Sequence, residues 1–347
     1  MNTTLRIVLL QPDPGDLISG GYLYNAAVGR ELKAIGLGEL QTREFEDLSA
    51  VSAADYLLLD SLYLSRTPPP RVLESMFRGG TQLYVLAHYF PPANPRLSKS
   101  AIDQWEHSAR AWLTHCKGVI TTGYGMREPW QTWLGERHSV GVAPPAVRAG
   151  HRTGRRRSSR DVEIRVLTIG GLTAGKNQRT LLEHIAGRSQ RNFHWQLIGS
   201  TKQDPAYARD FRRALGEYDL AGRVSLSGSL PHDDTLNALR ESDLFVSTSL
   251  FETFGLAAAE ALASGVPTLA FDVGDIRSWC GGLDGVWLHP VDDITSFLRT
   301  FDALVDTPGR LDVQPGVPQF TPRTWRQTLT MLLESMHVAP AWVGCTG

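Results

Sequence analysis

The chain alternates short apolar runs with longer segments of helical periodicity. The apolar runs are continuous rather than alternating, which is typical of parallel strands covered on both faces. They are RIVLL, YLLLD, LYVLAH and GVITT in the first half, and IRVLTIG, WQLIGS, RVSLSG, DLFVST and VPTLAF in the second. After the first run, Tyr24, Val28 and Leu32 recur at helical spacing and predict a helix over residues 21–37. The pattern predicts an α/β protein built from parallel sheets.

A basic segment, GHRTGRRRSSRD over residues 150–161, separates the two series of strands. Residues 151–160 hold five arginines and no acidic residue, and they lack apolar periodicity, which is typical of an exposed linker. An arginine cluster can also meet phosphate or a lipid surface, and that alternative stays open. The sequence therefore predicts two doubly wound domains, residues 1–150 and 161–318. Ligands are expected at the carboxyl ends of the strands and in the cleft between the domains.

Composition narrows the class of protein. The 347 residues hold 35 basic and 36 acidic side chains, without the broad positive charge of a nucleic-acid-binding protein. No apolar run approaches the ~20 residues that cross a bilayer, and the apolar block near the N-terminus is too short for a signal peptide. Cys116, Cys280 and Cys345 are odd in number and far apart, which predicts reduced thiols. We therefore expect a cytoplasmic protein that binds no nucleic acid.

The first candidate site is the segment IRVLTIGGLTAGKNQ, in which a strand leads through a glycine loop to Lys176. Glycines allow an anion to approach the backbone, and a lysine at a helix start adds a positive charge to the helix dipole. The segment also approaches the P-loop pattern, but Asn177 stands where that pattern needs Ser or Thr. A phosphate site is the leading interpretation; a P-loop NTPase and a plain surface lysine are the alternatives.

The second candidate site is DLFVSTSLFETFGLAAAEALASGVPTLAF. Glu252 is expected in a loop before a helix that begins near Phe254 or Gly255, and Glu260 is expected inside that helix. The free N–H groups at the helix start favour a phosphate, and an ionised Glu260 suits a pair of hydroxyl groups such as those of ribose. The alternatives are that Glu260 pairs with an internal arginine and that Glu252 only neighbours a helix cap.

The third candidate site lies at the edge of the first domain. Gly20 and Gly21 precede the first helix and permit close approach of a ligand to the backbone. His88 follows the run LYVLAH at the end of a strand, where it can donate or accept a hydrogen bond. Each signal is weak alone, and a structural role for His88 remains an alternative.

Taken together, these segments resemble glycosyltransferase family 4, the retaining nucleotide-sugar transferases of the GT-B fold. The most specific match is an E-x7-E element from Glu252 to Glu260, and further matches are ISGGYLYNAAVGREL, VAPPAV, GGLTAGKNQRTLL and FTPRTW. The resemblance implies two Rossmann-like domains that face a central cleft. It also implies that residues 319–347 form a helix that crosses back onto the N-terminal, acceptor-side domain.

The resemblance assigns roles to individual residues. Glu260 would hold the ribose hydroxyl groups of the donor, Glu252 would contact the transferred sugar, and Lys176 would neutralise the leaving diphosphate. His88 would face the transferred sugar and the reaction centre, so His88, Lys176 and Glu252 are the catalytic candidates. The implied donor site comprises Gly20, Gly21, Lys176, Glu252, Thr253, Phe254, Gly255, Leu256 and Glu260.

The implied activity is retaining transfer of a sugar from a UDP- or GDP-sugar to a hydroxyl group of a small-molecule, glycan or lipid-linked acceptor. The sequence contains no D-x-D triplet, so neither a metal nor another cofactor is expected, and Lys176 with a helix start would stabilise the diphosphate. Peripheral membrane contact is left open. The alternatives are a non-catalytic glycosyltransferase-like accessory protein and a P-loop NTPase.

Two positions depart from the family pattern. Gly171 stands where an arginine is usual before the lysine, so Arg277, an arginine of the linker or weaker donor binding must account for the difference. In DVGD, Asp275 stands where a second glycine is usual. An acidic group near a diphosphate is unfavourable by charge.

Overall fold

The computed structural model describes residues 5–15, 17–51, 53–77, 80–148, 163–187, 192–313, 315–316 and 324–338. The chain divides into two compact units. Unit 1 comprises Met1–Gly15, Gly21–Ala146 and Thr321–Gly347, and unit 2 comprises Asp16–Gly20 and Val147–Phe320. The predicted linker over residues 151–160 lies outside the described residues.

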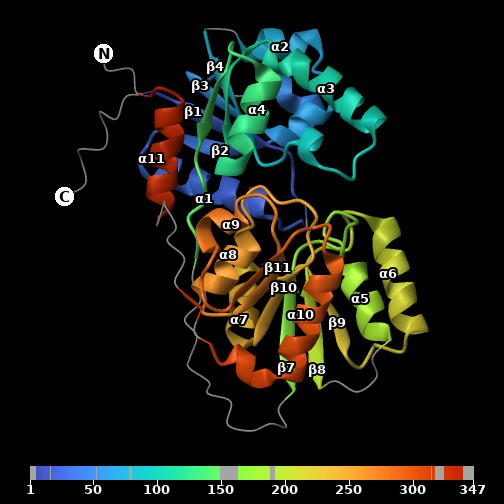
Figure 1. Ribbon diagram of the computed structural model, residues 1–347. Coiled ribbons are helices and arrows are strands. Elements are labelled where there is room, and N and C mark those ends of the chain that lie inside the picture. Colours follow the sequence, from blue (N-terminus) through green and yellow to red (C-terminus); the bar gives the residue numbers. More distant parts are fainter. Residues whose placement is uncertain are drawn as a thin grey trace, which may run out of the picture. The chain divides into compact units, whose positions relative to one another are not determined.

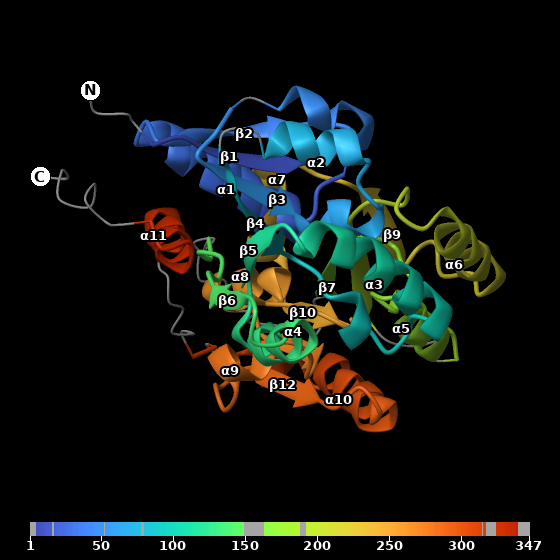
Figure 2. The same cartoon turned by 90° about the horizontal axis from the view of Figure 1, so that it is seen from above.

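Unit 1 is built on a parallel sheet whose strands run in the order β2-β1-β3-β4-β5-β6 (Figures 1 and 2). Its strands are β1 (Ile7–Gln11), β2 (Gly38–Thr42), β3 (Tyr56–Asp60), β4 (Gln82–Ala87), β5 (Cys116–Thr121) and β6 (Ser139–Val142). Its helices are α1 (Gly20–Ala34), α2 (Pro70–Met76), α3 (Lys99–Leu113), α4 (Arg127–Leu134) and α11 (Trp325–Ser335). Short 3₁₀ turns are η1 (Phe45–Ala50), η2 (Ser61–Ser65), η3 (Pro91–Ala93) and η4 (Tyr124–Met126).

Helices α1 and α11 share one face of this sheet. Leu9 of β1 packs in one core cluster with Val28 of α1 and Leu332 of α11, and α3 lies on the other side of the sheet (Figure 2). Helix α1 is the helix predicted over residues 21–37; it ends at Ala34, and Gly36 adopts a positive φ of 70° just beyond it. A glycine in that conformation is a common way to end a helix.

Unit 2 repeats the design with strand order β12-β11-β10-β7-β8-β9. Its strands are β7 (Ile164–Ile169), β8 (Phe193–Ile198), β9 (Val224–Gly228), β10 (Leu244–Ser247), β11 (Thr268–Phe271) and β12 (Val286–His289). Its helices are α5 (Gln178–Ala186), α6 (Pro205–Glu217), α7 (His232–Glu241), α8 (Leu256–Ala263), α9 (Ile276–Cys280) and α10 (Ile294–Asp306), with a turn η5 (Pro308–Leu311).

Both faces of the second sheet are covered. Val166 of β7 belongs to a core with residues of α5, α6 and α10, such as Phe297. The next residue, Leu167, points to the opposite face and packs with α7 and α8 through residues such as Leu236 and Ala258. Figure 1 shows α7 and α8 on one side of these strands and α5, α6 and α10 on the other. The predicted α/β class with two doubly wound parallel sheets is confirmed.

Three strands of the structure were not predicted: β2, β6 and β12. Each lies at the edge of its sheet, and each is only partly buried, with β12 intermediate at every position. An edge strand has one neighbour instead of two, so it does not need the continuous apolar run on which the prediction relied.

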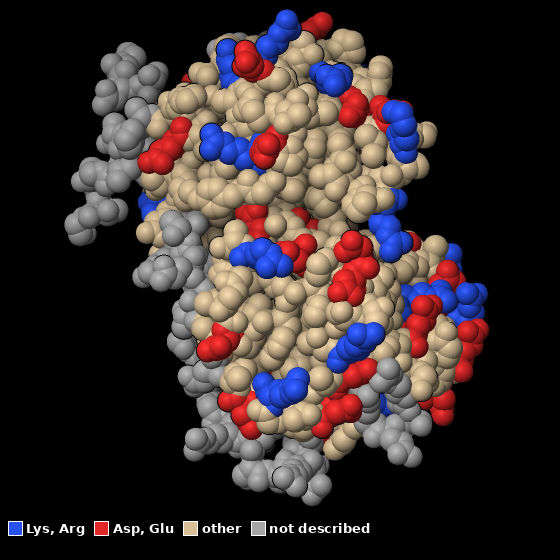
Figure 3. All heavy atoms as spheres, viewed as in Figure 1, with Lys and Arg blue, Asp and Glu red and all other residues tan. Residues whose placement is uncertain are grey.

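Charged side chains are distributed without a single dominant sign. On the face seen in Figure 3, basic and acidic side chains are interspersed over each unit. Within the part of the chain that the structure describes, none of the helices combines the length and apolar character that a bilayer span requires.

We expect Leu332→Ala to destabilise unit 1 strongly, because the Leu332 side chain is fully buried between α11 and the sheet. Loss of a buried leucine side chain costs about 2–5 kcal/mol of unfolding free energy. Urea denaturation measures the change, with Glu334→Ala, an exposed position on the same helix, as the control. Equal midpoints for both variants would contradict the packing of α11 on this core.

Candidate active site

Lys176 and Glu252 meet at the carboxyl edge of the sheet of unit 2. Lys176 Nζ lies 2.5 Å from Glu252 Oε1, and both side chains are partly buried. The two residues are far apart in sequence, but they follow β7 and β10, which are paired in parallel. Parallel strands end at the same edge of a sheet, so the loops that follow them are neighbours. The structure thus brings together two of the three predicted catalytic residues.

The backbone of the lysine turn is fixed to the loop after β10. Thr248 Oγ1 donates to the carbonyl of Lys176 at 2.8 Å, and Leu250 N donates to the carbonyl of Gly175 at 2.9 Å. Gly170 has φ of 151°, and a Cβ there would make an ordinary contact, at 3.5 Å, with the Lys176 side chain. The backbone conformation rather than lack of space therefore favours glycine at this position.

The predicted donor segment over residues 252–256 packs against α9. Trp279 Nε1 donates to the carbonyl of Phe254 at 3.0 Å, and Asp275 N donates to the carbonyl of Thr253 at 3.2 Å. Gly255 has φ of 84°, and a Cβ there would come within 2.6 Å of Ile276. Only glycine fits this position without strain.

Helix α8 begins at Leu256, one residue after the last predicted start, Gly255. Its first backbone N–H groups lie directly after the loop that carries Glu252. The N-terminal end of a helix carries partial positive charge and unbonded N–H groups, which favour an anion. Together with Lys176, this edge of unit 2 has the electrostatic character of a phosphate site.

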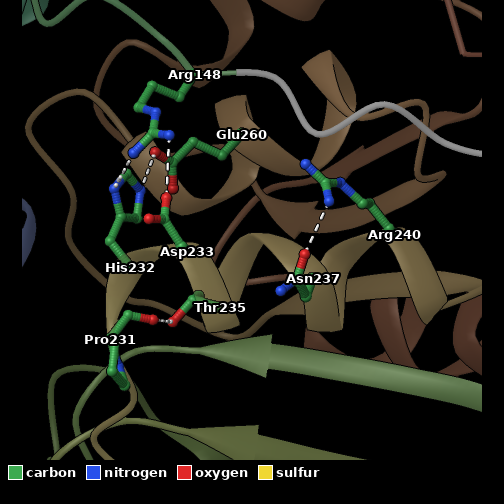
Figure 4. Close-up of polar contacts among 8 residues, drawn as sticks. All are labelled: Arg148, Pro231, His232, Asp233, Thr235, Asn237, Arg240 and Glu260. Carbon is green, nitrogen blue, oxygen red and sulfur yellow. Dashed lines mark hydrogen bonds and ion pairs between the residues drawn. The ribbon is translucent and has the colours of Figure 1, made fainter.

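Glu260 lies inside α8 and is 4% exposed. Its Oε1 lies 2.7 Å from Nε2 of His232, the first residue of α7 (Figure 4). The structure thus gives this buried carboxylate a histidine partner, where the sequence suggested either an arginine or the hydroxyl groups of a ligand. Arg148 contacts the same histidine on its other ring nitrogen, at 3.4 Å.

In unit 1, His88 follows β4 and joins a buried polar network. His88 Nε2 lies 2.8 Å from Asn25 Oδ1 and 3.8 Å from Asp60 Oδ2. Asn25 Nδ2 donates to Asp60 Oδ2 at 2.6 Å, and the other carboxylate oxygen accepts from Leu62 N at 2.8 Å. Because the Asn25 amide nitrogen is the donor to Asp60, its oxygen accepts from His88, which places the ring proton on Nε2.

Burial lowers the pKa of His88 below its ordinary value of 6.5, against an opposing effect of the Asp60 carboxylate. The ring is therefore neutral at neutral pH, with Nδ1 as the acceptor nitrogen. Gly21 lies beside it, since a Cβ there would come within 3.2 Å of the imidazole. Gly20, the first residue of α1, is grouped with unit 2.

The two departures from the family pattern have different structural settings. At Gly171, a Cβ would lie 1.9 Å from Oε1 of Gln203, so the carboxamide of Gln203 occupies the space beside this glycine. Arg277, one proposed substitute for the missing arginine, pairs with Asp272 at 2.5 Å. The linker arginines lie outside the described residues. Asp275 has φ of −88°, which any residue can adopt, so no second glycine is required there.

Sequence reasoning missed several residues of these networks, among them Asn25, Asp60 and His232. Asp60 carried a signal, because it ends the apolar run YLLLD at the edge where ligands bind. Asn25 lies in an otherwise apolar face of α1, and His232 lies in a polar helix start, so neither stands out from its sequence context.

Comparison with known proteins agrees with this architecture. The two doubly wound parallel sheets and the solved structures that superpose on them show the GT-B class of fold. Sucrose-phosphate synthase from Thermosynechococcus elongatus superposes with a TM-score of 0.73 at 17% identity, covering 99% of this chain and 100% of that one. Residues 163–307 match the family model described as "Glycosyl transferases group 1".

Two curated relatives each match 37% of the chain. The 2-deoxystreptamine N-acetyl-D-glucosaminyltransferase of Streptomyces fradiae is 31% identical over 130 residues, which is 37% of this chain and 31% of the relative. Mannosylfructose-phosphate synthase of Agrobacterium fabrum is 28% identical over 134 residues, 37% of this chain and 30% of the relative. The matches therefore span about a third of these relatives. The family match lies within unit 2, so this part of the chain is similar to group 1 glycosyltransferases.

We expect His88 to make stability depend on pH. The pKa of His88 in the folded chain lies below its ordinary value of 6.5. At a pH between the folded and the unfolded pKa of His88, the unfolded chain therefore binds more protons than the folded chain. The free energy of unfolding consequently falls as the pH drops through this range. His88→Gln removes this contribution, so its melting temperature should fall less than that of the wild type between about pH 7.5 and about pH 5.5.

Differential scanning calorimetry of the wild type and both variants at the two pH values measures this difference. The control is His107→Gln, at an exposed position of α3. An equal pH-dependent fall in His88→Gln and the wild type would show that the partly buried ring of His88 does not titrate as described.

Proposed function

We propose that this chain is a retaining glycosyltransferase that moves a hexosyl group from a UDP- or GDP-sugar to a hydroxyl group of an acceptor. The observation that carries the proposal is the ion pair of Lys176 with Glu252 at the strand edge of unit 2, directly before the start of α8. A cation, a helix start and a carboxylate are the groups that a diphosphate leaving group and a sugar hydroxyl need.

Lys176 supplies the positive charge in this proposal. An ammonium group has three hydrogens; one is used on Glu252, and two are available for phosphate oxygens. When the bond at the anomeric carbon breaks, negative charge develops on the diphosphate. The lysine and the N–H groups at the start of α8 would stabilise that charge without moving. This arrangement supports a mechanism that needs neither a metal ion nor another cofactor.

Glu252 and Glu260 have different roles in this proposal. Glu252, partly exposed and beside the lysine, would accept a hydrogen bond from a hydroxyl of the transferred sugar. Glu260, nearly buried, would accept from the ribose hydroxyl groups. Neither is assigned as a covalent nucleophile. Retention follows the family resemblance, with attack on the same face of the sugar and the departing phosphate as base.

His88 completes the proposed catalytic set from unit 1. Its neutral ring is anchored through Nε2 to Asn25, so its orientation is fixed by a buried network. The acceptor is proposed to be a small molecule, a glycan or a lipid-linked hydroxyl compound, in the cytoplasm and with peripheral membrane contact left open.

A second candidate is a glycosyltransferase-like protein that binds nucleotide without catalysis. The observation that favours it is the neutral carboxamide of Gln203 beside Gly171, where the family pattern has an arginine. A P-loop NTPase is less well supported, because the Asn177 side chain accepts a hydrogen bond from Thr180 at 2.9 Å and offers no hydroxyl for a magnesium ion.

Release of nucleoside diphosphate from a panel of UDP- and GDP-sugars, in the presence of EDTA, tests the proposal. We expect Glu252→Gln to lower the release rate by about 10²–10³, the usual loss for one group that stabilises a transition state. Its affinity for free UDP or GDP, measured by calorimetry, should stay near the wild-type value. Lys176→Met should lower both release and affinity, because it removes the charge that faces the diphosphate.

The control is Glu217→Gln, an exposed glutamate of α6, which should change neither quantity. Binding of nucleotide-sugar with no release by the wild type, whatever acceptor is added, would favour the accessory protein. Turnover that requires magnesium and ATP would favour the NTPase and contradict the glycosyltransferase proposal.

A further inference from the structure

The hydrogen bond between His232 and Glu260 joins the start of α7 to the interior of α8. The imidazole is 19% exposed and the carboxylate side chain 5% exposed. Figure 4 shows the ring with one nitrogen toward Glu260 and the other toward Arg148. A carboxylate this deeply buried needs a hydrogen-bond donor, since its burial without one is strongly unfavourable.

The direction of the hydrogen bonds in this cluster can be assigned. Arginine can only donate, so Nδ1 of His232 accepts from Arg148 Nη1 at 3.4 Å. The ring proton is then on Nε2, where it is donated to Glu260 Oε1 at 2.7 Å. Arg148 is itself held by Asp233, with 3.0 Å between Nη2 and Oδ1. Arg148 therefore donates to His232, and His232 in turn donates to Glu260.

The imidazole is not required to build the start of α7. Pro231 stands at the N-cap position without a side-chain hydrogen bond, and Thr235 Oγ1 donates to the Pro231 carbonyl at 3.1 Å (Figure 4). The helix also packs through Leu236 and Leu239 in the core beside α8. A change of the His232 side chain should therefore leave α7 in place and act mainly on Glu260.

We propose that His232 is a positioning residue that fixes the Glu260 carboxylate and thereby sets the preference of unit 2 for ribonucleotides over 2′-deoxyribonucleotides. The inference rests on the proposed function, in which Glu260 accepts from the ribose hydroxyl groups. The hydrogen bond from His232 to Oε1 favours one orientation of the carboxylate. That orientation also fixes the direction in which Oε2 can accept a hydrogen bond. A polar group held in one orientation discriminates strongly against a ligand that lacks its hydroxyl partner.

Affinities of UDP, GDP and their 2′-deoxy forms, measured by calorimetry on the full chain, test this inference. Of UDP and GDP, the one that binds the wild type more tightly is used for the comparison. We expect the wild type to bind it about 10–100-fold more tightly than its 2′-deoxy form, which is the range of one hydrogen bond to a charged group. In His232→Ala the ribonucleotide affinity should fall about tenfold while the deoxy affinity changes little, so the ratio collapses. His232→Gln, which retains a donor, should restore part of it.

A double variant separates positioning from general damage. Adding His232→Ala to Glu260→Gln should leave the ribo-to-deoxy ratio unchanged, because His232 acts through Glu260. A matched pair of arginines tests the outer part of the cluster. Arg148→Gln should lower the ratio less than His232→Ala does. Arg240→Gln should not alter it, because Arg240 is bonded to Asn237 of the same helix at 2.8 Å.

The outcomes distinguish this inference from the proposed function. A wild type that binds no nucleoside diphosphate would overturn both. A wild type that discriminates by ribose, together with a His232→Ala variant that keeps the same ratio, would overturn only the role of His232. A wild type that binds ribo and deoxy forms equally would overturn the assignment of Glu260 to the ribose and the inference that depends on it.

Discussion

The parallel pairing of β7 with β10 is the constraint on which the candidate active site of unit 2 depends. It brings the Lys176 turn and the Glu252 loop to one edge, and the bond from Leu250 N to the carbonyl of Gly175 continues the association beyond the sheet. The ion pair between the two partly exposed side chains contributes only about 1 kcal/mol or less. The position of the charged pair is therefore determined mainly by the backbone, and both side chains are sufficiently exposed to contact a ligand.

A second constraint is the burial of Glu260 inside α8. Ala258 and Ala261 of α8 pack in one core with Leu236 and Leu239 of α7, so both helices cover the same face of the sheet. The side chain of His232, at the start of α7, contacts the carboxylate inside α8. The apolar composition of α8 and the burial of its glutamate are thus compatible because the hydrogen-bond donor comes from a different element.

The sequence predicts those elements and residues that a short stretch of chain identifies by itself, such as an apolar run or the residue that follows it. The central strands have continuous apolar runs and are predicted, whereas β2, β6 and β12, three of the four edge strands, are missed. In the same way, Lys176, Glu252 and His88 follow strands and stand out as candidates. The partners of His88 and Glu260 come from helices. Asn25 lies in an apolar face and His232 in a polar helix start, so only the three-dimensional contact distinguishes them.

The two departures from the family pattern differ in their physical consequence: one leaves the backbone conformation unchanged, and the other changes the charge. Gly274 must be glycine, because its φ is 58° and a Cβ would lie 2.3 Å from the Glu252 carbonyl oxygen, whereas the next residue, Asp275, has an ordinary backbone conformation. The change at Asp275 therefore leaves the loop geometry intact. At Gly171 the difference is chemical, since the carboxamide of Gln203 can form hydrogen bonds but carries no charge. In the proposed reaction, this difference increases the share of the diphosphate charge that Lys176 must stabilise.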